Sequence, residues 1–206
     1  MPFNLPNILT VARIVMIFLA LVLATNAGVP GSIRVPSNLE MTLRYIACIL
    51  AIVAGVTDLL DGYLARKWNQ VTDFGALMDP LADKIFVTTT MLVLVEFHLL
   101  AAWVAAVVIC REFMVTGLRL LAVKTGKVIS ADKFGKLKTF LQMVMLFVGG
   151  LIWIHILDLD MVIYKAVKLR HLWSIFMWGI VIVTVGSGLN YFIKNRNLIM
   201  PRDEKA

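Results

Sequence analysis

The chain has 206 residues, of which 60% are hydrophobic and only 16% are charged. A soluble domain contains about a quarter charged residues, so this composition excludes an ordinary soluble globular protein and indicates an integral membrane protein. The formal net charge of +7 fits anionic lipids or phosphorylated substrates as partners, whereas no nucleic acid partner is expected because so little polar surface is available.

Six apolar segments predict an all-α fold with six transmembrane helices in a single membrane domain spanning residues 1–206. A helix needs about 20 residues to cross a hydrocarbon core of about 30 Å. The predicted spans cover residues 7–25, 41–64, 81–97, 102–123, 134–157 and 172–193. Because only a few residues separate the third span from the fourth, we expect these two helices to form an antiparallel hairpin.

The basic residues in the connections and near the ends of the spans predict the orientation in the membrane. An even number of spans puts both termini on one side, and cytoplasmic loops are enriched in Lys and Arg. The side that holds the termini carries Arg13, Arg66, Lys67, Lys84, Lys124, Lys127, Lys133, Lys136, Lys138, Lys194, Arg196, Arg202 and Lys205. The other side carries only Arg34, Arg44, Lys165, Lys168 and Arg170. Both termini are therefore expected in the cytoplasm.

Four aspartates lie around the cytoplasmic connection between the second and third predicted helices. Asp58 and Asp61 are three residues apart, and Asp79 and Asp83 are four apart, so each pair shares one helix face. Since an unpaired aspartate within a membrane costs at least about 2.5 kcal/mol, we expect cations to compensate the carboxylates. An oxygen-only cluster suits Mg²⁺ or Mn²⁺, and four carboxylates could hold two such ions.

Two of these features have simpler interpretations. Asp79 could cap a helix whose first residue is Pro80. Gly62, Ala65 and Gly75 could serve only helix packing, although small residues beside the acids also leave room for a ligand. A divalent-cation transporter is a remote alternative function, and these small residues argue for a bulkier ligand than an ion.

The acids and small residues together resemble the signature of the CDP-alcohol phosphatidyltransferase family. The matching positions are Asp58, Asp61, Gly62, Ala65, Arg66, Gly75, Asp79 and Asp83. The resemblance implies six transmembrane helices, a homodimer, and an alcohol that attacks a CDP-linked lipid at the cytoplasmic membrane surface and releases CMP. It implies a metal-ligand role for Asp58, Asp61, Asp79 and Asp83, with Asp83 also the general base. It implies that the nucleotide lies near Gly62, Ala65, Arg66 and Gly75.

Basic residues in the fourth and fifth predicted helices indicate an anionic acceptor. Arg111 and Arg119 lie within the fourth span, where cations face the bundle interior or a wet cavity. Lys136 and Lys138 lie at the start of the fifth span, on different helix faces because they are two residues apart. With Arg13, these four are the candidates for binding an acceptor phosphate. Purely structural pairing of Arg111, and attraction of either lysine to lipid headgroups, remain alternatives.

Three longer stretches, residues 6–13, 111–121 and 135–142, resemble the phosphatidylglycerophosphate synthase branch of the family. This resemblance implies CDP-diacylglycerol as donor and sn-glycerol 3-phosphate as acceptor. The nearest alternative is another branch, one that makes phosphatidylinositol phosphate or cardiolipin.

A polar stripe is predicted on the first helix. Asn7, Thr10 and Arg13 follow one another at three-residue steps, which places them within about a third of the helix circumference. Asn7 and Thr10 could thus line the nucleotide, or they could simply cap the start of the helix.

Overall fold

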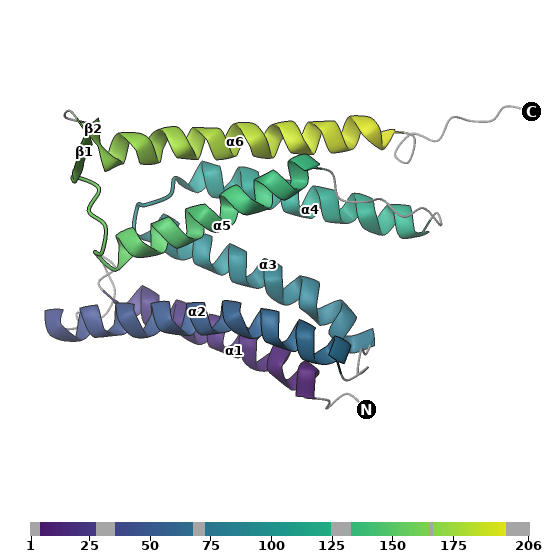
Figure 1. The fold of residues 1–206 in the computed structure, drawn as a ribbon, viewed down its shortest axis with the longest axis horizontal. Coiled ribbons are helices and arrows are strands. Elements are labelled where there is room, and N and C mark those ends of the chain that lie inside the picture. The colour runs from purple at the N-terminus through teal and green to yellow at the C-terminus, as the bar shows by residue number, and fades with distance from the viewer. Residues whose placement is uncertain (1–4, 28–35, 68–72, 125–132, 165–166, 197–206) are drawn as a thin grey trace, which may run out of the picture. The chain divides into compact units, whose positions relative to one another are not determined.

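The computed structural model describes residues 5–27, 36–67, 73–124, 133–164 and 167–196. It describes the backbone alone for residues 5, 6, 37, 38, 58–67, 73, 76, 124, 133, 163, 164 and 167. These residues form six helices and one short β-hairpin (Figure 1). The helices are α1 (Leu5–Asn26), α2 (Ser37–Lys67), α3 (Asp73–Glu96), α4 (Ala102–Lys124), α5 (Lys133–Trp153) and α6 (Leu169–Lys194). Strands β1 (Val162–Tyr164) and β2 (Val167–Lys168) pair antiparallel between α5 and α6. The predicted helical class is confirmed, with six helices among the described residues.

Four helical stretches are long and apolar enough to cross a membrane. They are Asn7–Asn26, Leu39–Thr57, Phe134–Trp153 and Leu169–Lys194. Helices α3 and α4 fall outside this group because charged residues interrupt their apolar sequences, among them Asp83 in α3 and Glu112 in α4. The chain is an integral membrane protein by this measure, with four candidate spans among the described residues.

Helix α3 begins earlier than predicted. It starts at Asp73, eight residues before the expected start of the third span at residue 81. Pro80 consequently lies inside α3, so Asp79 is not the residue that caps a helix beginning at Pro80, and that interpretation is wrong. A proline within a helix costs one intrahelical hydrogen bond, which the long apolar segment that follows outweighs.

Helix α5 ends at Trp153 rather than at residue 157, the predicted end of the fifth span. The cause is His155, whose φ of 59° lies in the left-handed region. The amides of the two residues after His155 donate to the carbonyl oxygen of Leu151, at 3.0 and 3.2 Å, which is the geometry of a helix C-cap. The same motif ends α3, where His98 has a φ of 57°.

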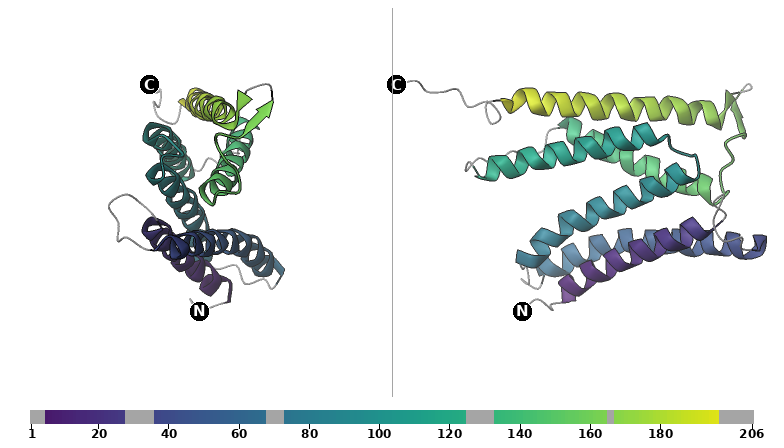
Figure 2. Two further views of the ribbon diagram at one scale, coloured as in Figure 1. Left: turned by 90° about the vertical axis from the view of Figure 1, so that its left-hand side faces the viewer. Right: turned by 180° about the vertical axis from the view of Figure 1, so that it is seen from behind.

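The chain packs as two compact units, residues 1–100 with 149–157 and residues 101–148 with 158–206. In the first unit, α1 packs against both α2 and α3 (Figures 1 and 2). Small residues are buried along the second half of α1, at Ala20 and Ala24, and directly after its end, at Ala27. Small side chains let membrane helices approach closely, and this fixes α1 beside the two helices that carry the aspartates.

Arg44 of α2 ties together helix ends within the first unit. It is only 8% exposed, and its guanidinium donates to the carbonyl oxygens of Ala27 (3.3 Å) and Trp153 (3.0 Å). It also donates to Glu40 Oε1 at 2.7 Å and lies 4.9 Å from the centroid of the Phe97 ring. These contacts satisfy carbonyls that the ends of α1 and α5 would otherwise leave open.

In the second unit, α4 packs against α6 (Figure 2). Val115 and Leu118 of α4 and Tyr191 of α6 form a small apolar core. Arg111 and Arg119, two of the candidate acceptor cations, lie on α4, and Lys136 and Lys138 lie at the start of α5.

Candidate functional site

The predicted acidic stripe lies on one face of α3. Gly75, Asp79 and Asp83 all lie on α3, and steps of four residues keep them on one face. Asp79 and Asp83 are exposed, and Gly75 is half-buried. The structure therefore places two carboxylates one helical turn apart on one face of α3.

The polar residues predicted to form a stripe on α1 are buried. Asn7, Thr10 and Arg13 are all buried, and they continue the line of small residues that packs against α2 and α3. The Thr10 hydroxyl donates to Asp79 Oδ1 at 3.0 Å. Thr10, expected near the nucleotide, thus contacts a predicted metal ligand directly and holds one of its two carboxylate oxygens.

The remaining candidates of the acidic motif lie near the end of α2. The helix continues through Lys67, so Asp58 and Asp61 occupy one helical turn. Their side chains, and those of Gly62, Ala65 and Arg66, lie outside the described residues. Convergence of all four aspartates therefore stays a prediction.

The described donors at this end of the first unit are the carboxylate oxygens of Asp79 and Asp83, a donor type that hard divalent cations prefer. Asp79 has one oxygen held by Thr10, which orients the carboxylate as partners in the outer shell of metal sites do. Among the described side chains, no group of three or more potential ligands is gathered within coordinating distance. Because the two acids of α2 are not among them, a complete metal site would need Asp58 and Asp61 as well.

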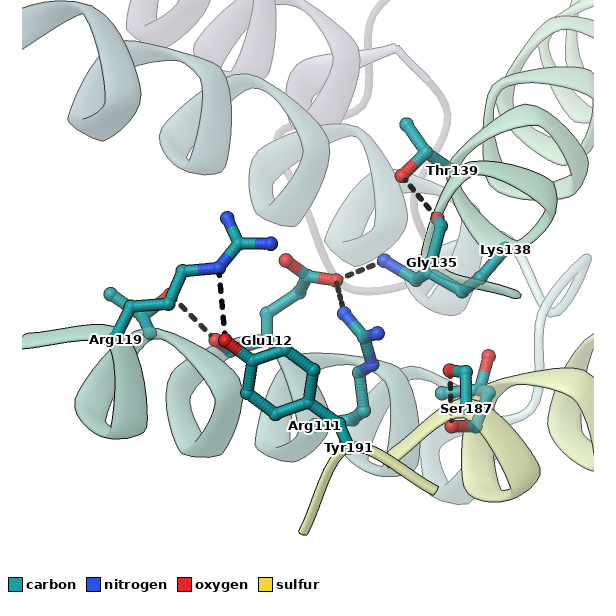
Figure 3. A network of polar contacts seen from close by, with 10 residues as sticks. Arg111, Glu112, Arg119, Gly135, Lys138, Thr139, Ser187 and Tyr191 are labelled. Carbon is teal, nitrogen blue, oxygen red and sulfur yellow. Dashed lines mark hydrogen bonds and ion pairs between the residues drawn. The ribbon is translucent and has the colours of Figure 1, made fainter. Parts of the chain in front are cut away.

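A separate charged network lies within the second unit and joins α4 to α5 (Figure 3). The Glu112 carboxylate accepts from Arg111 Nη1 at 3.3 Å and forms an ion pair with Lys138 Nζ through the same oxygen, Oε1. The Lys138 side chain is only 3% exposed, and that of Glu112 is 29% exposed. Two candidate acceptor cations from different helices therefore meet at one anionic atom.

Lys136 and Lys138 lie on different faces of α5, as their spacing of two residues predicts. Lys138 is buried and paired with Glu112, whereas Lys136 is exposed and has no ion-pair partner within the described ranges. Of the two lysines, Lys138 is the one that shares an anion with Arg111.

Arg119 lies two turns further along α4 and contacts α6. Its Nε donates to the hydroxyl oxygen of Tyr191 at 3.4 Å, and its guanidinium lies 5.9 Å from the ring centroid (Figure 3). The residue is exposed. Its charge is therefore oriented by an aromatic ring but not neutralised by a carboxylate in the described part of the second unit.

Two glycines make room for Arg111. A Cβ added at Gly188 of α6 would lie 3.3 Å from Arg111 Cγ, and one added at Gly135 of α5 would lie 3.8 Å from Arg111 Nη2. The first distance is tighter than ordinary van der Waals contact. Glycine at position 188 thus allows the Arg111 side chain to pass close to α6.

Sequence reasoning missed two residues of this network. Glu112 could have been recognised from the sequence, because an ionisable residue within a membrane helix is by default a functional candidate. Glu112 also directly follows Arg111. Tyr191 carried no such signal, since its contact with Arg119 depends on how α4 and α6 pack.

Comparison with known proteins identifies the family. Residues 3–186 match the model of the CDP-alcohol phosphatidyltransferase family. A Bacillus subtilis protein named CDP-diacylglycerol–glycerol-3-phosphate 3-phosphatidyltransferase is 40% identical over 193 residues, which cover 94% of this chain and 95% of that protein. Proteins of the same name from Haemophilus influenzae (38% identity, 74% of this chain and 77% of that protein) and Rickettsia typhi (31% identity, 92% and 95%) are also similar. The chain therefore belongs to the CDP-alcohol phosphatidyltransferase family.

Proposed function

We propose that this protein transfers the phosphatidyl group from CDP-diacylglycerol to sn-glycerol 3-phosphate, giving phosphatidylglycerophosphate and CMP. The family and the names of its relatives support the donor and the reaction. One structural observation supports the acceptor: Arg111 and Lys138, from two helices, share a single anionic atom. Two cations that share one carboxylate keep a net positive charge, which suits an acceptor that carries a phosphate.

The aspartates supply the binding and proton chemistry in this proposal. Asp58, Asp61, Asp79 and Asp83 would hold two divalent cations, Mg²⁺ or Mn²⁺, which when bound neutralise the pyrophosphate and the leaving CMP. Asp83 accepts the proton of the 1-hydroxyl of the acceptor, whose oxygen then attacks the phosphorus that carries diacylglycerol. Thr10 keeps the Asp79 carboxylate oriented.

Other residues would bind the two substrates. The small residues Gly62, Ala65 and Gly75, with Arg66, would surround the nucleotide, and Asn7 would extend this surface from α1. The acceptor phosphate would contact the cations Arg13, Arg111, Arg119, Lys136 and Lys138. Of these cations, Arg13 and Lys138 are buried, and a charge removed from water attracts an anion more strongly than an exposed one does.

The membrane arrangement proposed here has six spans, with both termini and the reacting groups on the cytoplasmic side. The excess of basic residues on that side supports the orientation. Counting α3 and α4 as spans is supported by their lengths of 24 and 23 residues, which suffice to cross the hydrocarbon core. Their charged residues would then face protein or substrate and not lipid. A homodimer is proposed from the family resemblance.

An acceptor panel tests this function. The purified protein is incubated with CDP-diacylglycerol and Mg²⁺ or Mn²⁺, and CMP release is measured with sn-glycerol 3-phosphate, glycerol, inositol phosphate or phosphatidylglycerol. We expect rapid release only with sn-glycerol 3-phosphate, and none without divalent metal. Preferential use of inositol phosphate or phosphatidylglycerol would assign the protein to another branch, and absence of CMP release with every acceptor would refute the reaction.

A further inference from the structure

Glu112 occupies an unusual position among the candidate acceptor cations. It lies in the middle of α4, and its Oε1 contacts both Arg111 Nη1 and Lys138 Nζ (Figure 3). Across the described ranges, no other carboxylate forms an ion pair with either cation. A single acid therefore determines how the two cations lie relative to each other.

The network retains both charge and hydrogen-bond donors. Arg111 and Lys138 together carry two positive charges against the one negative charge of Glu112, so the group is cationic. A guanidinium has five N–H donors and an ammonium three, and Glu112 engages one nitrogen of each. Arg111 Nε is buried without a hydrogen-bond partner in the described structure. Donors thus remain for an anion that binds beside Glu112.

The geometry of the group is also restrained. The Arg111 side chain passes so close to Gly188 that a Cβ added there would lie 3.3 Å from its Cγ, so the backbone of α6 limits where this side chain can lie. Lys138 is almost fully buried, so its ammonium cannot move into water without disrupting packing. Loss of the carboxylate would leave this ammonium unpaired in apolar surroundings, where its charged form is unfavourable.

We propose that Glu112 is the positioning residue of the acceptor-phosphate site, where it holds Arg111 and Lys138 at one point and keeps Lys138 charged, without itself contacting the reacting atoms. This inference rests on the proposed function. In a different role, Glu112 would occupy the place of the phosphate and would be displaced by the substrate. Glu112 would then weaken acceptor binding, whereas a positioning Glu112 strengthens it.

Glu112→Gln tests the inference because glutamine keeps the shape and removes the charge. We measure kcat and KM for sn-glycerol 3-phosphate and for CDP-diacylglycerol in detergent micelles. Loss of one charge-assisted contact predicts a rise of roughly tenfold in KM for sn-glycerol 3-phosphate. KM for CDP-diacylglycerol should stay within about twofold of the wild-type value, since that substrate lies outside the network.

The matched control is Glu40→Gln. The Glu40 side chain is 31% exposed and pairs with the buried Arg44, so this substitution makes a similar change in a pair that has no proposed role in binding. KM for sn-glycerol 3-phosphate should not change in this variant. An equal rise in both variants would show that loss of a buried ion pair acts through general stability, and this would overturn the inference.

The double variant Glu112→Gln/Lys138→Met, together with Lys138→Met and Glu112→Gln, forms a double-mutant cycle. Where Glu112→Gln alone folds poorly, the double variant is compared with Lys138→Met, because the double variant leaves no unpaired lysine. If Glu112 acts largely through Lys138, adding Glu112→Gln to Lys138→Met should raise the acceptor KM by less than about threefold. An unchanged or lowered KM in Glu112→Gln, or full additivity in the cycle, would overturn the inference. Failure of the wild-type protein to use sn-glycerol 3-phosphate would instead remove the proposed function, and this inference with it.

Discussion

Replacing Thr10 with valine removes one hydroxyl from the contact between α1 and α3 and leaves the shape of the side chain nearly unchanged. Thr10 is 1% exposed, and its hydroxyl donates to Asp79 Oδ1 at 3.0 Å. Valine fills the same space without a donor. The substitution therefore isolates the effect of this hydrogen bond on the Asp79 carboxylate.

The expected magnitude follows from the charge of the acceptor and its exposure. A hydrogen bond to a charged group contributes about 1.5–3 kcal/mol. Because Asp79 is exposed, water replaces part of the lost contact, and the lower end of this range applies. About 1.4 kcal/mol corresponds to a tenfold change, so the Mg²⁺ concentration that gives half-maximal activity should rise about tenfold, as expected for an outer-shell partner of a metal ligand.

The assay is CMP release from CDP-diacylglycerol with saturating acceptor over a Mg²⁺ titration, paired with Mn²⁺ binding measured without substrate. Thr10→Ser should restore both values because it keeps the hydroxyl. Thr25→Val is the matched control on the same helix, since the Thr25 hydroxyl bonds only to the helix backbone, at Leu21 and Val22. Unchanged metal dependence in Thr10→Val would refute the argument that Thr10 orients a metal ligand.

Three further substitutions give distinct expected results. Asp83→Asn should lower kcat by at least about a hundredfold, the typical contribution of a general base, as measured by CMP release. Arg44→Met should lower the free energy of unfolding by about 3 kcal/mol and Tm by about 6–12 °C, because four hydrogen-bonded groups lose their buried partner; a thermal melt in detergent measures it. Gly188→Leu should raise KM for sn-glycerol 3-phosphate by about tenfold or more, because its side chain needs the space that Arg111 occupies.

Each of these has a control in the chain. Asp158→Asn changes an exposed acid in the connection before β1 and should leave kcat unchanged. Arg170→Met removes an exposed ion pair with Asp160, and such pairs contribute little, so Tm should barely change. Gly179→Leu fills open space on α6 and should leave acceptor KM unchanged. If a control has the same effect as its partner variant, the structural reason given for that variant is wrong.

Helix positions could be predicted from the sequence because hydrophobic length is a local property. Ends were predicted less well, since they depend on specific backbone geometry. His155 ends α5 through a left-handed conformation that few residues other than glycine adopt. Pro80 lies inside α3 although proline commonly marks a helix start.

The candidate site could be predicted in part. The buried stripe of Asn7, Thr10 and Arg13 follows from helix periodicity alone. Its contact with Asp79 could not be predicted, because it depends on the packing of α1 against α3. The spacing of Lys136 and Lys138 predicts that they lie on different helix faces. Only the tertiary structure identifies Lys138 as the buried partner of Glu112.

The most direct test of the account is the number of Mn²⁺ ions bound by the detergent-solubilised protein, measured by electron paramagnetic resonance. We expect about two bound ions per chain in the wild-type protein. Both ions should be lost when Asp58, Asp61, Asp79 and Asp83 are all replaced by asparagine while the protein stays folded. Retention of bound Mn²⁺ in that variant, or no bound Mn²⁺ in the wild-type protein with CDP-diacylglycerol present, would contradict the claim that these four aspartates form a metal site.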